Sequence, residues 1–354
     1  MEYKFSVLFS WTSGKPVSSS EGNIPIYGSN GIIGYTDLGR FKNKIILGRV
    51  GAYCGSVAYC KDSFNATDNT LITSCNEDHI IYSYAYYLLK SFNLNNFAGG
   101  AAQPLITQSI LKRLKCDIPD INIQHRIASI LSTYDTLIEN NTKRISLLEK
   151  MAENLYKEWF VRFRFPGHEN VEMENGLPKG WKRGYLSDVC QFKRGKNITS
   201  SEMEEGNVPV ISAGLEPSGY HSCSNVKGTC VTMSSSGANA GYIAIHYLDI
   251  WAADCSYIEE ATTPNIYYVY ELLNNIRNVI NNFQRGAAQP HVYPKDVNRI
   301  KLILPSENFM KRASERLQKM HEEIHVLQHQ NSLLARQRDL LLPRLMSGKL
   351  EVKA

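Results

Sequence analysis

Apolar side chains recur every three or four residues along a long stretch in the middle of the chain, residues 122–165. The stripe contains Ile123, Ile127, Ile130, Tyr134, Leu137, Ile145, Leu148, Ala152, Leu155 and Trp159. This spacing is typical of one face of an α-helix, and about 40 residues at about 1.5 Å each span about 60 Å. An apolar stripe of this length must be buried against another element, so we expect a partner helix of similar length. Residues 308–349 are predicted to form that helix.

The second helix is part of a larger internal repeat. The motif Gly100-Ala101-Ala102-Gln103-Pro104 recurs as Gly286-Ala287-Ala288-Gln289-Pro290, 186 positions later. The same offset relates further pairs on both sides of the motif: Gly51 and Gly237, Gly55 and Gly241, Asp68 and Asp254, Pro119 and Pro305, Arg126 and Arg312, and Leu148 and Leu334. The chain is therefore predicted to be one globular unit followed by one long helix, twice.

Inside each unit, short runs rich in Val, Ile and Tyr alternate with Gly-rich turns, which favours strands. We predict strands at 44–47 and 56–60 around a loop tip, counterparts at 229–233 and 242–246, and short helices at 82–92 and 266–283. The fold class is thus α+β, with two mixed, mainly β units and an internal pseudo-two-fold repeat. The predicted boundaries are 1–121 and 181–307 for the units, 122–165 and 308–349 for the helices, and 166–180 for an acidic linker with Pro and Gly.

The order of the repeat also predicts how the helices pair. Because each unit stands at the start of its helix, an antiparallel coiled coil would separate the two units and place them at opposite ends. Each apolar stripe contains one Asn, Asn141 or Asn331, and two facing amides in a seam satisfy each other and fix the register. Pairing Asn141 with Asn331 gives full overlap of the helices. The alternative is that both amides lie in solvent at the margin of the seam.

The composition, with 43% apolar and 21% charged residues, is that of a soluble globular protein. The formal net charge of +5 resides mostly in the helical stretches, which permits a nucleic-acid partner without requiring one. No run of 18 apolar residues and no signal peptide is present, so a cytoplasmic protein is expected. The 8 cysteines contain no Cys-x-x-Cys pair, so we expect free thiols and no zinc site.

Motifs of catalysis are absent from the sequence. There is no Gly-x-x-x-x-Gly-Lys-Ser/Thr loop for nucleotide phosphates and no Gly-x-Gly-x-x-Gly for a dinucleotide or a methyl donor. Residues 262–265, Thr-Thr-Pro-Asn, come nearest to the Asn-Pro-Pro-aromatic loop of adenine methyltransferases and do not match it. His321, His325 and His329 lie on one helical face, where we expect solvent rather than a metal ion. These absences favour a binding protein over an enzyme.

The order of the segments resembles a known family. The chain runs through a globular unit, a long helix, a Phe-Pro-Gly linker, Leu-Pro-Lys-Gly-Trp at 177–181, a second unit and a second helix. Gly-Ala-Ala-Gln-Pro precedes each helix, and Leu-Leu-Pro-Arg-Leu-Met-Ser-Gly-Lys-Leu closes the second at 341–350. Over nearly the whole chain this looks like the specificity subunit of type I restriction-modification systems. One departure is that the first unit lacks the Leu-Pro-x-Gly-Trp leader, so we expect its first strand to be short.

The resemblance implies a non-catalytic subunit of an enzyme complex. Each globular unit would be a target recognition domain that reads one half of a bipartite, asymmetric site in double-stranded DNA. The helices, as central and distal conserved regions, would set the spacing and dock two methyltransferase (modification) subunits, with Tyr156, Trp159 and Phe160 contacting a partner. Restriction/translocase subunits would join this core. S-adenosylmethionine, ATP and Mg would belong to the partners, with no cofactor or metal in this chain and no membrane.

The expected DNA contacts are polar or basic residues beside Gly and Pro turns, where loops present side chains outward. Scaffold positions agree between the units while the tips differ, as with Arg49 against Ser235 and Tyr53 against Asn239, and two different half-sites require such a difference. The candidates for base contacts are Tyr27, Ser29, Asn30, Arg49, Tyr53, Asn69, Ser212, Ser235, Ser236, Asn239 and Gln289, and those for phosphate contacts are Lys15, Lys193, Lys196 and Arg285. A phosphate contact is the alternative for Arg49, and a structural turn is the alternative for Gln289.

Two other classes of protein stay open from the sequence. A diverged, self-sufficient DNA methyltransferase would bind S-adenosylmethionine by itself, which a titration of the isolated chain would reveal. A stand-alone DNA-binding or coiled-coil scaffold protein would explain the helices but not the repeated polar tips. Absence of sequence-dependent DNA binding by the assembled complex would favour the scaffold.

Overall fold

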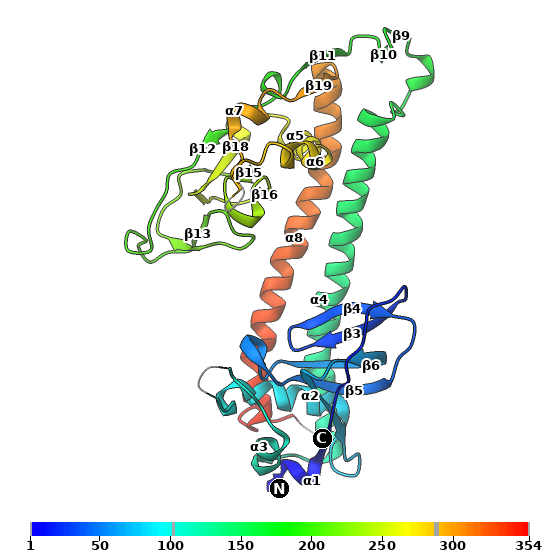
Figure 1. Cartoon of the computed structure of the whole chain (residues 1–354), viewed down its shortest axis with the longest axis vertical. Helices are drawn as coiled ribbons and strands as arrows, with labels where there is room; N and C mark the ends of the chain where they lie inside the picture. The colour runs from blue at the N-terminus through cyan, green and yellow to red at the C-terminus, as the bar shows by residue number, and fades with distance from the viewer. Residues whose placement is uncertain (1, 101–102, 287–289, 353–354) are drawn as a thin grey trace. The chain divides into compact units, whose positions relative to one another are not determined.

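The computed structural model describes residues 2–100, 103–286 and 290–352. They form two compact units: unit 1 is drawn from Met1–Asn140 and Gln330–Ala354, and unit 2 is Asn141–His329. The two long helices, α4 (Ile121–Tyr156) and α8 (Glu307–Met346), each run through the boundary and contribute to both units (Figure 1). In the described chain, no helix is long and apolar enough to cross a membrane.

Both long helices were predicted, and their ends have local causes. α4 begins where the Asp120 carboxylate accepts a hydrogen bond from the Ile123 backbone N–H at 3.0 Å, an N-cap interaction. It continues as a π-helical turn over Lys157–Val161, and Phe163 then adopts a positive φ of 58°. The helix therefore ends before the predicted limit at 165. α8 ends at Met346, before the predicted limit at 349, and Gly348 follows with a φ of 70°, as is common after helix C-termini.

Unit 1 is built on a six-stranded sheet with the strand order β2-β7-β5-β6-β3-β4 (Figure 1). The strands are β2 (Phe9–Ser13), β3 (Ile24–Gly28), β4 (Gly31–Thr36), β5 (Phe41–Gly48), β6 (Val57–Ala66) and β7 (Thr70–Cys75). Central strand β5 is apolar on both faces because both are covered. Ile45 and Leu47 join the core around α2 (Tyr82–Ser91), whereas Ile46 packs with Phe64 on the other face.

A small sheet closes unit 1 beside the start of α4. Its strands are β1 (Glu2–Lys4) and β8 (Lys115–Asp117), flanked by α1 (Phe5–Leu8) and α3 (Gln108–Arg113). The buried Gln124 side chain of α4 donates hydrogen bonds to the carbonyls of His79 and Pro119 and accepts one from the Ile81 N–H. This amide ties the helix to the segment that leads into α2.

Unit 2 repeats the design with shorter strands. A four-stranded sheet has the order β12-β18-β15-β16, a three-stranded sheet β14-β13-β17, and a two-stranded sheet β11-β19. The strands are β11 (Lys182–Tyr185), β12 (Lys193–Arg194), β13 (Val208–Ile211), β14 (Gly219–His221), β15 (Cys230–Ser234), β16 (Ile243–His246), β17 (Trp251–Ala252), β18 (Cys255–Glu259) and β19 (Lys301–Leu304). The helices are α5 (Ile266–Asn275), α6 (Arg277–Asn281) and α7 (Pro294–Val297). Each unit is thus mixed α and β, as predicted.

Strand pairing confirms the internal repeat. Ile45 of β5 pairs with Tyr59 of β6, and 186 positions later Val231 of β15 pairs with Ile245 of β16, both antiparallel. The predicted linker is partly ordered: β9 (Met173–Glu174) and β10 (Leu177–Pro178) form a hairpin. The absence of periodicity concealed this hairpin because its strands have only two residues each.

The predicted solvated face of α8 is wrong at His321, which is buried in unit 2. Its Nε2 lies 3.0 Å from Glu271 Oε1, and its Nδ1 lies 2.9 Å from the Tyr247 hydroxyl. Both ring nitrogens are therefore satisfied, which makes burial of the imidazole possible. These contacts attach α5 and the segment after β16 to the helix.

Candidate nucleic-acid interface

Three loops of unit 1 surround a pocket of about 400 Å³. They are the turn between β3 and β4, the 3-10 turn Gly51–Tyr53 after β5, and the turn between β6 and β7 at residues 67–69. The structure brings together here four residues predicted to contact DNA: Ser29, Asn30, Tyr53 and Asn69. It adds Asp68, which the sequence analysis did not select.

Hydrogen bonds within unit 1 hold these loops against one another. The Ser29 hydroxyl donates to the Asn69 carbonyl at 2.7 Å, and the Ser56 hydroxyl donates to the Ser29 carbonyl at 2.6 Å. The Arg49 backbone N–H donates to the same Asn69 carbonyl at 3.0 Å. The Ser29 hydroxyl therefore donates its only hydrogen within unit 1, and its oxygen can only accept a hydrogen bond from DNA.

Glycine permits the tight 3-10 turn that presents Tyr53. Gly51 and Gly55 have φ values of 74° and 89°, in the region that side chains disfavour. A Cβ at Gly55 would lie 2.3 Å from the backbone N of Asn95, so no larger residue fits. The Tyr53 ring is consequently held at the surface, with 60% of the residue exposed.

Arg49 lies beside the pocket with most of its donors uncommitted. Its Nη1 donates to the Ser13 hydroxyl at 3.4 Å, a long bond for one of five N–H groups. Tyr27 is half-buried. Its ring packs edge-on against Phe64 with the centroids 5.6 Å apart, and burial raises the pKa of its phenol to about 12. Tyr27 thus has a packing role, and its predicted contact with DNA stays a prediction.

The corresponding turn of unit 2, Gly237–Asn239, has different chemistry. Ser235 and Ser236 are only 4% and 5% exposed, which contradicts their prediction as DNA contacts. The Ser236 hydroxyl donates to Asp254 Oδ2 at 2.6 Å, and Val292 N–H donates to the Ser235 carbonyl. Asn239 remains half-buried on the turn, and the half-buried Ser212 shares a hydrogen bond with Ser218 at 3.0 Å.

Two predicted phosphate ligands occupy equivalent positions in the units. The Lys15 backbone N–H donates to the Ala66 carbonyl at 3.0 Å, and that of Lys196 donates to the Ala252 carbonyl at 2.9 Å. Both lysines are exposed where the first strand of each large sheet leads into its loop. The match between Lys15 and Lys196 does not follow the sequence offset, so only strand pairing reveals it.

The other predicted cations are engaged within unit 2. Lys193 forms an ion pair with Glu259, and Arg285 Nη2 lies 2.9 Å from Asp296 Oδ2. Contact with a phosphate would therefore compete with these carboxylates. Gln289, the remaining candidate, lies outside the described residues.

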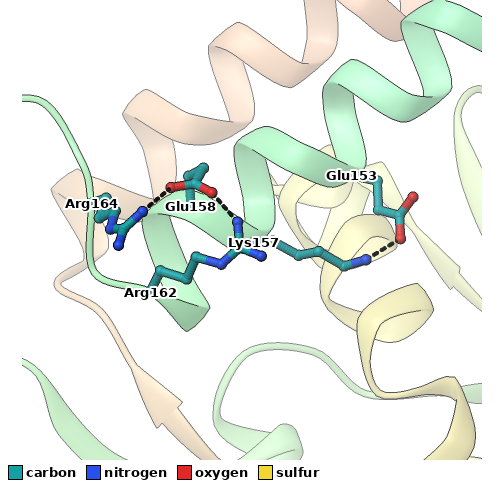
Figure 2. Close-up of polar contacts among 5 residues, drawn as sticks. All are labelled: Glu153, Lys157, Glu158, Arg162 and Arg164. Atoms are coloured by element: carbon teal, nitrogen blue, oxygen red, sulfur yellow. Dashed lines mark hydrogen bonds and ion pairs between the residues drawn. The ribbon is translucent and has the colours of Figure 1, made fainter.

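The predicted partner contacts lie at the end of α4. Tyr156, Trp159 and Phe160 are 5%, 7% and 7% exposed and belong to the core of unit 2, and Tyr156 and Phe160 also line an apolar pocket there, so their contact with a partner stays a prediction. The charged side chains of this segment are more exposed and form ion pairs. Figure 2 shows Lys157 paired with Glu153, and Arg162 and Arg164 paired with Glu158. Trp159 and Phe160 pack against Phe309, and the Tyr156 ring packs against Tyr268.

Each unit also contains an apolar pocket at a helix C-terminus. In unit 2 a pocket of about 640 Å³ lies between Phe160, after α4, and Ile303 of β19. In unit 1 a pocket of about 450 Å³ lies between Met346 of α8 and Asp117 of β8. Phe160 and Ile303 correspond to Met346 and Asp117 at the repeat offset, so the two pockets share these positions of the repeat. The rest of their linings differ, because α5 contributes to the pocket of unit 2 and the start of α4 to the pocket of unit 1.

The described part of the chain contains no group of three His, Cys, Asp or Glu side chains placed to hold a metal ion. What the geometry does provide is one loop site, built twice on the same strand frame, with different side chains in each copy. A protein with two recognition units of one design is the class that this arrangement defines.

The model of the type I restriction modification DNA specificity domain matches the chain twice, over residues 11–150 and 178–335. The chain therefore belongs to this family. It is 27% identical over 321 residues to the MjaIX specificity subunit of Methanocaldococcus jannaschii, covering 78% of this chain and 71% of the relative. It is 26% identical over 320 residues to a putative type I specificity subunit of Mycoplasma genitalium, covering 88% and 82%.

The crystal structure of the S subunit of a type I restriction-modification system from M. genitalium matches with a TM-score of 0.68. The two chains are 23% identical, and the match covers 98% of this chain and 96% of the other. At this identity the likeness establishes a common fold.

Proposed function

We propose that this chain is the sequence-recognition subunit of a type I restriction-modification complex and that each unit reads one half of a bipartite, asymmetric DNA site. One observation carries the proposal: units 1 and 2 share their strand pairing but differ at the loop tips. In unit 2 the buried Ser235 stands at the position of Arg49, and Asn239 stands at that of Tyr53, so the accessible side chains of the two tips differ. A common frame with different hydrogen-bonding side chains suits two different half-sites.

The helices α4 and α8 act as an antiparallel coiled coil that sets the distance between the half-sites. Within unit 1, Arg338 of α8 forms an ion pair with Asp135 of α4. Within unit 2, Arg144 Nη2 of α4 lies 2.6 Å from Glu323 Oε1 of α8. Later positions of α4 thus meet earlier positions of α8, which supports the antiparallel direction. The pairing of Asn141 with Asn331 stays a prediction of the proposed coiled coil.

Two modification subunits dock at the apolar pockets by the helix C-termini, one in each unit. The pockets share the repeat positions of Phe160 with Met346 and of Ile303 with Asp117, and identical partner chains need related surfaces. The rim positions Ile303 and Leu350 are 40% and 42% exposed, so apolar area is available at both pockets. Burial of these side chains by a partner would contribute to affinity through the hydrophobic effect.

The chemistry belongs to the partners of this chain. Modification subunits bring S-adenosylmethionine for adenine methylation, and restriction/translocase subunits bring ATP and Mg for DNA movement and cleavage. This division of labour fits a chain whose sequence has neither a nucleotide phosphate loop nor a methyl-donor motif. The contribution of the chain is the choice of the DNA site.

Mapping of methylated bases in cells that carry this chain and its partners tests the function. We expect one methylated motif composed of two short specified parts separated by an unspecified gap, and its loss when the gene for this chain is deleted. A continuous motif, or methylation that persists after the deletion, would contradict the proposal.

A further inference from the structure

Asp68 is the only charged side chain among the residues that line the pocket of unit 1. It is exposed on the turn at residues 67–69, next to Asn69, and it lines the pocket together with Ser29 and Asn30. Among the described residues, no Lys or Arg forms an ion pair with the Asp68 carboxylate. A bare carboxylate on a surface that meets DNA repels phosphates, so its presence there needs a reason.

Unit 2 contains the matching carboxylate, Asp254, but there other side chains of the unit contact it. Asp254, on the corresponding turn at 253–254, accepts a hydrogen bond from Ser236 at 2.6 Å and lies 3.7 Å from Arg194 Nη2. Strand pairing identifies the unit 1 residues at the positions of Ser236 and Arg194. They are Val50, which has no hydroxyl, and Ser13. Unit 1 has therefore lost both groups that engage the carboxylate in unit 2.

A free carboxylate has a narrow choice of partners on DNA. It accepts hydrogen bonds and donates none, so in the major groove it can pair only with the amino groups of cytosine N4 and adenine N6. The O6 of guanine and the O4 of thymine are acceptors and repel it. On adenine the neighbouring N7 is also an acceptor and would face the second carboxylate oxygen, whereas cytosine presents no acceptor beside N4.

We infer that Asp68 is a specificity-determining residue that reads the N4 amino group of a cytosine in the half-site of unit 1. The inference rests on the proposed function, since it assumes that unit 1 faces DNA. Asn30 and Asn69 beside it both donate and accept, so they tolerate several bases, whereas Asp68 excludes two bases outright. The contact restricts one position of the motif to a C·G pair.

The test is methylation mapping with Asp68→Asn and Asp68→Ala in the assembled complex. We expect one C·G position to become degenerate, in the half-site that Arg49→Ala also affects, while every other position keeps its base. Discrimination at that position should fall roughly 10- to 100-fold, the usual worth of one good base contact. Asp254→Asn is the matched control and should leave the base requirements of both half-sites unchanged, because Ser236 and Arg194 already hold the Asp254 carboxylate.

An unchanged motif in both Asp68 variants, with unchanged melting temperatures, overturns the inference. Stronger methylation of all sites alike also overturns it, because that result describes a carboxylate that only repels phosphates. Replacing the paired guanine by inosine removes the minor-groove amine and should leave binding intact; loss of binding rejects the cytosine assignment. If the complex with the unaltered chain methylates no defined motif, the result contradicts the proposed function itself and not only the role of Asp68.

Discussion

Arg49 and Ser235 occupy the same position of the repeated frame, yet one is a cation beside a pocket and the other is a buried hydroxyl. The backbone at Arg49 is fixed by its own hydrogen bond to Asn69 and by the bond from the Ile106 N–H to its carbonyl. The guanidinium therefore stands on a rigid support, which a base contact requires.

Arg49→Ala should relax the base requirement at one position of one half-site, by roughly 1–3 kcal/mol if the contact is a bidentate one to guanine. Arg49→Lys is the matched control, because it keeps the charge but not the planar fork of donors. Duplex-binding selections with each complex would measure the change. Equal weakening on every sequence in Arg49→Ala, with full recovery in Arg49→Lys, would mean that Arg49 contacts phosphate.

His246 makes unit 2 sensitive to acid. Burial lowers the pKa of its imidazole to about 4, and its Nε2 lies 2.9 Å from the Thr232 hydroxyl. The unfolded chain, with an ordinary pKa near 6.5, binds the proton first as the pH falls, so stability is full above about 6.5 and is lost progressively toward 4. Urea denaturation should show the chain about 2 kcal/mol less stable at pH 5 than at pH 7 through this group. The variant His246→Gln should lose that part of the pH dependence, and an unaltered dependence would contradict the assignment.

At the scale of residues, the sequence predicted the polar tip of unit 1 and missed much of unit 2. Ser29, Asn30, Tyr53 and Asn69 do gather at one pocket because Gly and Pro turns place loops there. The predicted exposure of Ser235 and Ser236 was wrong because the exposure of a side chain depends on which neighbouring segment covers it. Their partners Val292 and Asp254 lie too far along the chain for a local sequence pattern to reveal these contacts. Strand pairing alone makes Lys15 equivalent to Lys196.

Among the elements, the two pockets at helix ends give the sharpest prediction. Ile303→Glu in unit 2 or Leu350→Glu in unit 1 should each reduce the number of bound modification subunits from two to one, and the double variant should bind none. A charge placed in an apolar interface is costly to desolvate, whereas both positions are exposed enough to leave folding intact. Native mass spectrometry of the purified complex would count the subunits.

Leu248→Glu provides the control, because Leu248 is exposed in unit 2 but does not line the pocket there. Two bound subunits in the double variant would mean that docking takes place elsewhere on the chain.

The positions of helices and strands were predicted from the sequence more completely than the exposure of single site residues. The helices near 82–92 and 266–283 and the strands around each loop tip were predicted, since apolar periodicity reports directly on which face is buried. The π-helical turn Lys157–Val161 and the β9–β10 hairpin were not. The π-helical turn packs against a partner distant in sequence, Phe309 against Phe160, which no local pattern contains. The hairpin has strands of only two residues each, too short for a period to show.

For the whole molecule, the spacing of the two half-sites is the property to test. Inserting seven helical residues after Asn140 in α4 and seven after His329 in α8 adds two turns to each helix and keeps the apolar stripe in phase. At about 1.5 Å per residue this adds about 10 Å, or about three base pairs at 3.4 Å each. Methylation mapping should return the original half-sites with a gap about three base pairs longer.

A replacement of seven residues at each place, without a change in length, should keep the original gap. If the lengthened chain still reads both half-sites at the original spacing, the helices do not measure the distance.

Because α4 and α8 each pass from one unit into the other, the unfolding of the units should be coupled. Tyr84→Ala removes a fully buried ring from the core of unit 1 and should cost about 3–5 kcal/mol. Calorimetry of the variant should show one transition moved to lower temperature. Two separate transitions, with that of unit 2 unmoved, would refute the coupling. Under coupled unfolding, damage to one core exposes the entire polypeptide to proteolysis, so no fragment survives that could recognise one half-site alone.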